Sequence, residues 1–174
     1  MARPDPTEYA PYYEKYVALV SENDILKAMK SAAETGLAFL AGVSESDASV
    51  CHPPYTWTIK QVVGHLTDSE RVFGYRALRF ARGDSTPLPG FDENAYAKAI
   101  RLDDIPLGNL LAEFASLRQS HVAFFDHLSE EAWQRRGTAN NAAISVRALA
   151  FILIGHERHH ASIVRKRLSM TNCS

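Results

Sequence analysis

The chain has 174 residues, of which 46% are hydrophobic and 22% charged, a composition typical of one globular domain with a sizeable core. The formal net charge of −1 at pH 7 gives no electrostatic sign of a nucleic-acid or anionic-membrane partner. The longest strongly apolar run, residues 148–155, is too short to cross a bilayer, and the N-terminus carries no apolar signal segment. Cys51 and Cys173 form no C-x-x-C pair, and we therefore expect a cytoplasmic protein with reduced thiols.

The hydrophobic pattern predicts helices over most of the chain, and no run of alternating β-branched residues predicts a strand. Residues 1–20, rich in proline and tyrosine at their start, are expected to form an extended arm. The arm would pack on a helical body at residues 21–168. The first long helix is expected at residues 23–43, with Asn23 as its N-cap.

The clearest helix start lies at Thr58. Thr58 and Gln61 have the spacing of a capping box, and Trp57 before the cap can pack on Val62 as a hydrophobic staple. The pattern that follows predicts a second helix as far as about residue 81.

The remaining segments also read as helical. We expect a short helix at residues 93–100 and a third long helix from Asp104, with Pro106 in its first turn. A break at Ser129 precedes a polar loop at residues 137–141.

A fourth helix is expected to cap at Ser145 and to run to about residue 168. Four long amphipathic helices in a chain of this length predict an all-α protein, a four-helix bundle that forms a single domain over residues 1–174.

Two histidines of the fourth helix point to a metal site. His156 and His160 are four residues apart within an apolar stripe, so one helix face would carry both imidazoles. His65 lies on the inward stripe of the second helix and supplies a third imidazole. Three histidines with an open position form the ligand set of a catalytic zinc site, and the set also suits nickel. The alternative is that the histidines only pack, each paired with a neighbouring carbonyl or carboxylate.

The same segment formally contains His-Glu-x-x-His, the zinc-protease motif. That motif takes its third ligand downstream, and no His, Glu or Asp follows His160. We therefore regard the match as coincidental and expect Glu157 to form a salt bridge with an arginine on the helix surface.

Two further residues have open roles. His121 lies on the core stripe of the third helix. It could serve as a fourth metal ligand or as an acid–base group, but we expect a hydrogen-bonded histidine at the boundary of the core. Arg76 is in register with His65 and would meet an anionic substrate at the mouth of the bundle, or pair with Glu70 or Asp68.

Several segments together resemble the DinB-like superfamily, also called YfiT-like. They are WTIKQVVGHLTDSER at residues 57–71, PLPGFD at 87–92, SVRAL at 145–149 and GHERHH at 155–160. The likeness covers about residues 20–168. It implies a four-helix bundle, often dimeric, with a metal held by His65, His156 and His160. The segment ASIVR after His160 departs from the Arg-Gly-Gln version common in the family.

The resemblance also implies a range of activities. Characterised relatives include metal-dependent transferases and isomerases that use low-molecular-weight thiols, and others are described as metal-dependent hydrolases without an established reaction. We therefore expect a hydrolase or thiol S-transferase that acts on a small molecule through zinc or nickel, in a homodimer; no catalytic residue beyond the ligands is assigned. The alternatives are a non-catalytic metal-binding or stress-associated bundle and a metal-free bundle.

Overall fold

Side chains cap the starts of the two long helices that begin after Thr58 and Ser145. Thr58 Oγ1 accepts a hydrogen bond of 3.0 Å from the backbone N–H of Gln61, and the Gln61 side chain accepts one of 2.9 Å from the backbone N–H of Thr58. The predicted capping box therefore forms. Ser145 Oγ likewise accepts from the backbone N–H of Ala148 at 2.9 Å, which confirms the predicted start of the last helix.

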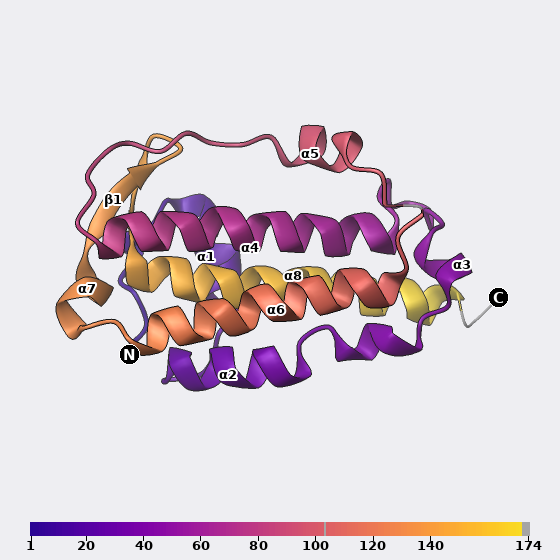
Figure 1. The fold of residues 1–174 in the computed structure, drawn as a ribbon, viewed down its shortest axis with the longest axis horizontal. Helices are drawn as coiled ribbons and strands as arrows, with labels where there is room; N and C mark the ends of the chain where they lie inside the picture. The colour runs from indigo at the N-terminus through magenta and orange to yellow at the C-terminus, as the bar shows by residue number, and fades with distance from the viewer. Residues whose placement is uncertain (103, 172–174) are drawn as a thin grey trace.

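A computed structural model describes residues 1–102 and 104–171, and its four long helices lie side by side along the length of the molecule (Figure 1). The helices are α2 (Ile25–Thr35), α4 (Ile59–Ala81), α6 (Leu107–Asp126) and α8 (Val146–Thr171). This arrangement confirms the predicted all-α four-helix bundle. Cys173 lies outside the described residues, and Cys51 is exposed with a free thiol.

Three of the predicted helix boundaries are wrong: both ends of the first helix, for which Asn23 was the expected N-cap, and the start of the third. The first helix starts after Asp24, whose carboxylate accepts from two backbone N–H groups, and it ends at Thr35 instead of residue 43. A 3-10 helix at Ala38–Gly42 continues the chain after Gly36. The third helix starts later than predicted because Pro106 is its N-cap instead of lying in its first turn.

The loop predicted at residues 137–141 is part of a β-hairpin, and the prediction that the chain lacks strands is wrong. Strands β1 (Arg136–Ala139) and β2 (Ala142–Ser145) pair antiparallel. Asn140 and Asn141 have φ angles of 50° and 61°, as the two-residue turn of a tight hairpin requires. Strands of four residues are too short for the alternating pattern to be recognised.

The N-terminal arm is helical as well as extended. It contains two 3-10 turns and the short helix α1 (Glu14–Val17), and the side chains of Tyr9, Tyr16 and Val17 are buried. Proline at the first position of each 3-10 turn favours this conformation because its φ is already helical.

Short helices fill the connections. α5 (Glu93–Ala99) follows the loop after α4 as predicted, and α7 (Glu130–Gln134) starts behind Ser129, the predicted break. α3 (Glu45–Ala48) precedes α4. Within the described residues, no helix combines the length and apolar content needed to span a membrane.

A layer of polar side chains divides the bundle core. On α8, buried apolar residues at 148–154 belong to one hydrophobic cluster, and Ala161 and Val164 belong to another. The same division occurs on α4 and on α6. Between the clusters lies what we call the polar layer: Ser69, Glu70, Arg118, His121, His156 and Glu157.

Candidate metal centre

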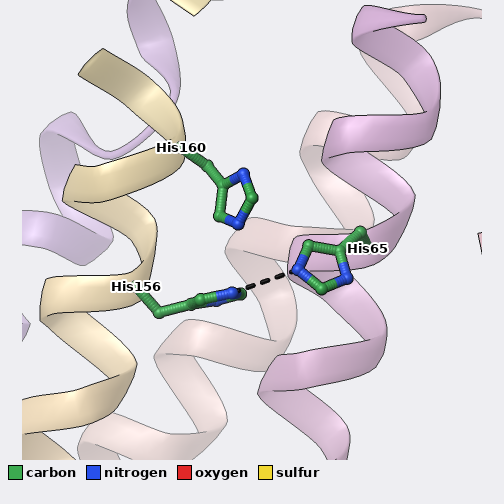
Figure 2. Close-up of side chains that lie close together, drawn as sticks. All are labelled: His65, His156 and His160. Atoms are coloured by element: carbon green, nitrogen blue, oxygen red, sulfur yellow. Dashed lines mark hydrogen bonds between the residues drawn. The ribbon is translucent and has the colours of Figure 1, made fainter. Parts of the chain in front are cut away.

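Helices α4 and α8 bring three imidazoles together at one side of the polar layer. His65 projects from α4, and His156 and His160 project from α8 one turn apart (Figure 2). Their ligand nitrogens all lie within 4.8 Å of one another, and Nε2 of His65 is 3.1 Å from Nε2 of His156. The structure thus places the three residues singled out in the sequence in one cluster.

Burial keeps these imidazoles neutral. It lowers the pKa of His65 to about 4, and together with the neighbouring His65 and His159 it lowers the pKa of His160 to about 3. The pKa of His156 is also well below its usual range, first because of burial and then because of His160 and His65. At pH 7 all three therefore have a nitrogen lone pair, which is the form that binds metal ions.

The cluster forms part of the wall of a cavity of about 490 Å³. Aromatic rings surround the imidazoles: Tyr16 packs edge-on against His156 with ring centroids 5.1 Å apart, and Trp57 lies 5.0 Å from the ring of His65. Phe73, about two turns after His65 on α4, has its ring centroid 6.1 Å from that of His156. A small molecule in this cavity would contact the cluster and an aromatic surface together.

The N-terminal arm reaches this cavity, which was not predicted from the sequence. Tyr12, Tyr13 and Tyr16 line it, although the arm was expected only to pack on the body. The signal that was available is that Tyr16 follows Tyr12 by four residues and Tyr13 by three, because residues at these spacings are neighbours on one face of a helix. His159 is half-buried and also lines the cavity.

Behind α8 the polar layer holds a buried ionic network. Arg118 is 0% exposed and donates to both carboxylate oxygens of Glu70, at 2.7 and 2.9 Å, and to Glu157 at 2.5 Å. Glu157 is therefore paired with an arginine as expected, but in the core instead of on the helix surface. The difference arises because the face of α8 that carries Glu157 is buried in the bundle, where the side chain of Arg118 reaches it from α6.

His121 belongs to this network. Its Nδ1 lies 2.9 Å from Glu70 Oε1, and it is absent from the histidine cluster. A side chain at Gly74 would collide with the His121 ring, since a Cβ there would lie 2.0 Å from Nε2. His121 is thus a hydrogen-bonded boundary histidine, as expected.

Arg76 lines the cavity on the α4 side. Its side chain is buried, and Nη2 donates to the carbonyl of Pro89 at 2.8 Å. The alternative partners considered for it are engaged elsewhere: Glu70 pairs with Arg118, and Asp68 lies 3.7 Å from Arg71.

Comparison with known proteins identifies the family. A model of the DinB superfamily matches residues 28–164. The chain belongs to the DinB superfamily. A DinB relative from Oceanobacillus iheyensis, named "Putative metal-dependent hydrolase OB0413", is 27% identical over 130 residues, which cover 73% of each chain.

The DinB fold is also matched by a solved structure. YfiT from Bacillus subtilis, described as a probable metal-dependent hydrolase with an unusual four-helix bundle topology, superimposes with a TM-score of 0.67 at 18% identity. The match covers 97% of this chain and 93% of YfiT. At this identity the likeness concerns the fold.

Proposed function

We propose that the protein is a metal-dependent enzyme for a small-molecule substrate, with His65, His156 and His160 as the metal ligands. The observation that carries the proposal is a cluster of three neutral imidazoles on the wall of a cavity large enough for such a molecule. The names of the two relatives, both referring to metal-dependent hydrolases, support it.

The donor set fits a divalent ion such as zinc or nickel. Two nitrogens bound to one tetrahedral ion at 2.0–2.1 Å lie about 3.3 Å apart. The Nε2 atoms of His65 and His156 are 3.1 Å apart. The longest separation in the cluster, 4.8 Å, needs a small inward shift of a ring. Three protein ligands leave a coordination position for a water or substrate atom.

Such an ion supplies a Lewis acid that activates either a water molecule for hydrolysis or a small thiol for transfer. The chain provides the neutral ligands, and its aromatic side chains limit the access of bulk water to them. Hydrolysis and thiol S-transfer both remain within the proposal, and the relatives' names favour hydrolysis.

The alternative is a non-catalytic metal-binding bundle, in which the ion only joins two helices. A closed site with His121 as a fourth ligand would favour this alternative. The pairing of His121 with Glu70 argues against it, and so does the cavity beside the cluster.

The first experiment is elemental mass spectrometry on untagged protein that has not been exposed to a chelating resin. We expect close to one zinc, nickel or similar ion per chain, and its loss in His65→Ala, His156→Ala and His160→Ala. His127→Ala is the matched control, because His127 is exposed at the end of α6. A wild-type protein that folds but takes up no metal on reconstitution would overturn the proposal.

Activity assays then separate the two reactions. Panels of esters and amides are compared with electrophiles, such as epoxides and aryl halides, that are supplied with small thiols. Cleavage of an ester or amide without thiol-dependent turnover would eliminate S-transfer. Turnover of an electrophile only in the presence of a thiol would eliminate hydrolysis.

A further inference from the structure

The cavity beside the histidine cluster contains a buried cation, Arg76, that forms no direct ion pair with a carboxylate of the described residues. Arg76 is 3% exposed, and among the described residues no Asp or Glu lies within the 4.0 Å of an ion pair with it. Arg118, which is 0% exposed, has two carboxylate partners. A buried charge that is unbalanced is unfavourable, so the comparison indicates that Arg76 takes its counter-ion from outside the chain.

Arg76 and the histidine cluster lie at two ends of the same cavity, joined by one aromatic ring. The guanidinium carbon of Arg76 is 5.7 Å from the ring centroid of Phe73, and that centroid is 6.1 Å from the centroid of His156. Both Arg76 and His65 project from the same face of α4, about three turns apart. A ligand made of one aromatic ring and a short chain is long enough to contact both Arg76 and the histidine cluster.

The wall between the two ends is aromatic. Tyr13 packs edge-on against Phe73 with centroids 6.2 Å apart, and Tyr12 packs on Tyr13 at 5.4 Å. This surface suits the apolar part of a ligand whose two ends carry the polar groups.

A single negative charge fits the cavity better than a double one. Glu93, at the start of α5, also lines the cavity and is half-buried. Burial raises the pKa of the Tyr13 hydroxyl, the Arg76 charge opposes that rise, and the Glu93 charge adds to it. Because Glu93 lines the same cavity as Arg76, its charge repels a ligand anion, and it repels a carboxylate less than a phosphate dianion.

We infer that the substrate carries a carboxylate that pairs with Arg76, while its reactive bond lies at the histidine cluster and its apolar part contacts the aromatic wall. The planar guanidinium can bind both oxygens of a carboxylate. The position of the reactive bond rests on the proposed function, whereas the carboxylate site does not require a metal ion.

The test is isothermal titration calorimetry on metal-free protein at pH 7.5. The probes are 3-phenylpropanoate and its neutral counterpart 3-phenylpropanamide. We expect wild-type protein to bind the carboxylate at least tenfold more tightly than the amide. Arg76→Gln should abolish this preference. Arg71→Gln is the matched control, because Arg71 lies on the same helix but is exposed and pairs with Glu113; its preference should be unchanged.

A second variant tests the site without altering Arg76. Glu93→Gln removes the competing negative charge, and we expect it to tighten carboxylate binding several-fold while leaving amide binding unchanged. Arg76→Lys should keep part of the preference, since the charge remains but the two-pronged geometry is lost. Circular dichroism confirms that each variant is folded before titration.

The inference is wrong if wild-type protein shows no preference for the carboxylate, or if Arg76→Gln weakens both probes equally. It is also wrong if Glu93→Gln leaves carboxylate binding unchanged. The metal proposal can fail separately. If the protein takes up no metal but still shows an Arg76-dependent preference for the carboxylate, the anion site is supported and the proposed metal-dependent activity is not.

Discussion

At the scale of single residues, Arg118 has the largest electrostatic role in the core. Its guanidinium balances Glu70 and Glu157, and all three are nearly inaccessible to water. Removing one member of a buried ionic group leaves the others charged or forces them to take up protons, and both outcomes destabilise the fold.

We expect Arg118→Met to lower the free energy of unfolding by about 3–5 kcal/mol, because it leaves two buried carboxylates without their cation. Urea denaturation measures the change. The control is Arg71→Met, which removes an exposed pair with Glu113 and should cost at most about 1 kcal/mol. Equal effects of the two substitutions would show that the buried network contributes no more to the free energy of unfolding than an exposed ion pair does.

The same network makes stability depend on pH through Glu70. Burial alone would raise the pKa of Glu70, but the charge of Arg118 and hydrogen bonds from His121 and Arg118 lower it to about 2. A carboxyl whose folded-state pKa is depressed stabilises the protein above its unfolded pKa, 4.5, and loses that contribution as the pH falls toward 2.

We therefore expect the difference in unfolding free energy between wild type and Glu70→Gln to be constant above about pH 4.5 and to shrink steadily below it. Denaturant titrations at several pH values between 2 and 7 provide the measurement. A difference that stays constant down to pH 2 would mean that Glu70 is not ionised in the folded protein.

At the scale of elements, contact between α1 and α8 positions the tyrosines of the cavity. A Cβ at Gly155 would lie 2.0 Å from the backbone oxygen of Tyr16, so only glycine allows α1 to approach this closely. The neighbouring residue on α8 is His156, whose ring packs against Tyr16. The approach of two backbones thus sets one wall of the site.

Gly155→Ala should displace α1 and lower the free energy of unfolding by about 1–3 kcal/mol. Urea denaturation gives the stability, and the titration with 3-phenylpropanoate shows whether the cavity changes with it. Gly108→Ala on α6 is the control: apart from its chain neighbours and the backbone of its own helix, no atom lies within 4 Å of a Cβ there, so we expect no destabilisation and a gain of up to about 1 kcal/mol. If Gly155→Ala left the free energy of unfolding unchanged, the close approach of α1 to α8 would be refuted.

At the scale of the whole molecule, the histidine cluster joins two helices that are far apart in sequence. His65 lies on α4 and His156 on α8, and these two helices pack against each other in the bundle. An ion bound to the folded chain alone stabilises it by mass action.

We expect zinc or nickel to raise the free energy of unfolding, by about 4 kcal/mol when the free ion exceeds its dissociation constant a thousandfold. Thermal unfolding with added metal and with EDTA measures this effect, which His65→Ala and His160→Ala should abolish. His127→Ala should respond as wild type does. A chelator-insensitive melting temperature in a metal-containing protein would contradict the prediction.

Much of this protein follows from local sequence. The capping box at Thr58, the cap at Ser145 and the helical stripes predicted the bundle and placed three histidines on inward faces. These features could be read because a helix repeats every 3.6 residues and its caps lie within one turn. The family resemblance selected the same three residues.

What local sequence left open was decided by contacts between segments distant in the chain. The burial of Glu157 depends on Arg118 from α6, and the tyrosine wall depends on the close approach of the arm to Gly155. The hairpin at residues 136–145 forms from strands of four residues that pair with each other and lie against the body. Helical periodicity describes one element at a time, so the partner of a buried charge and the lining of a cavity are determined only when the elements pack.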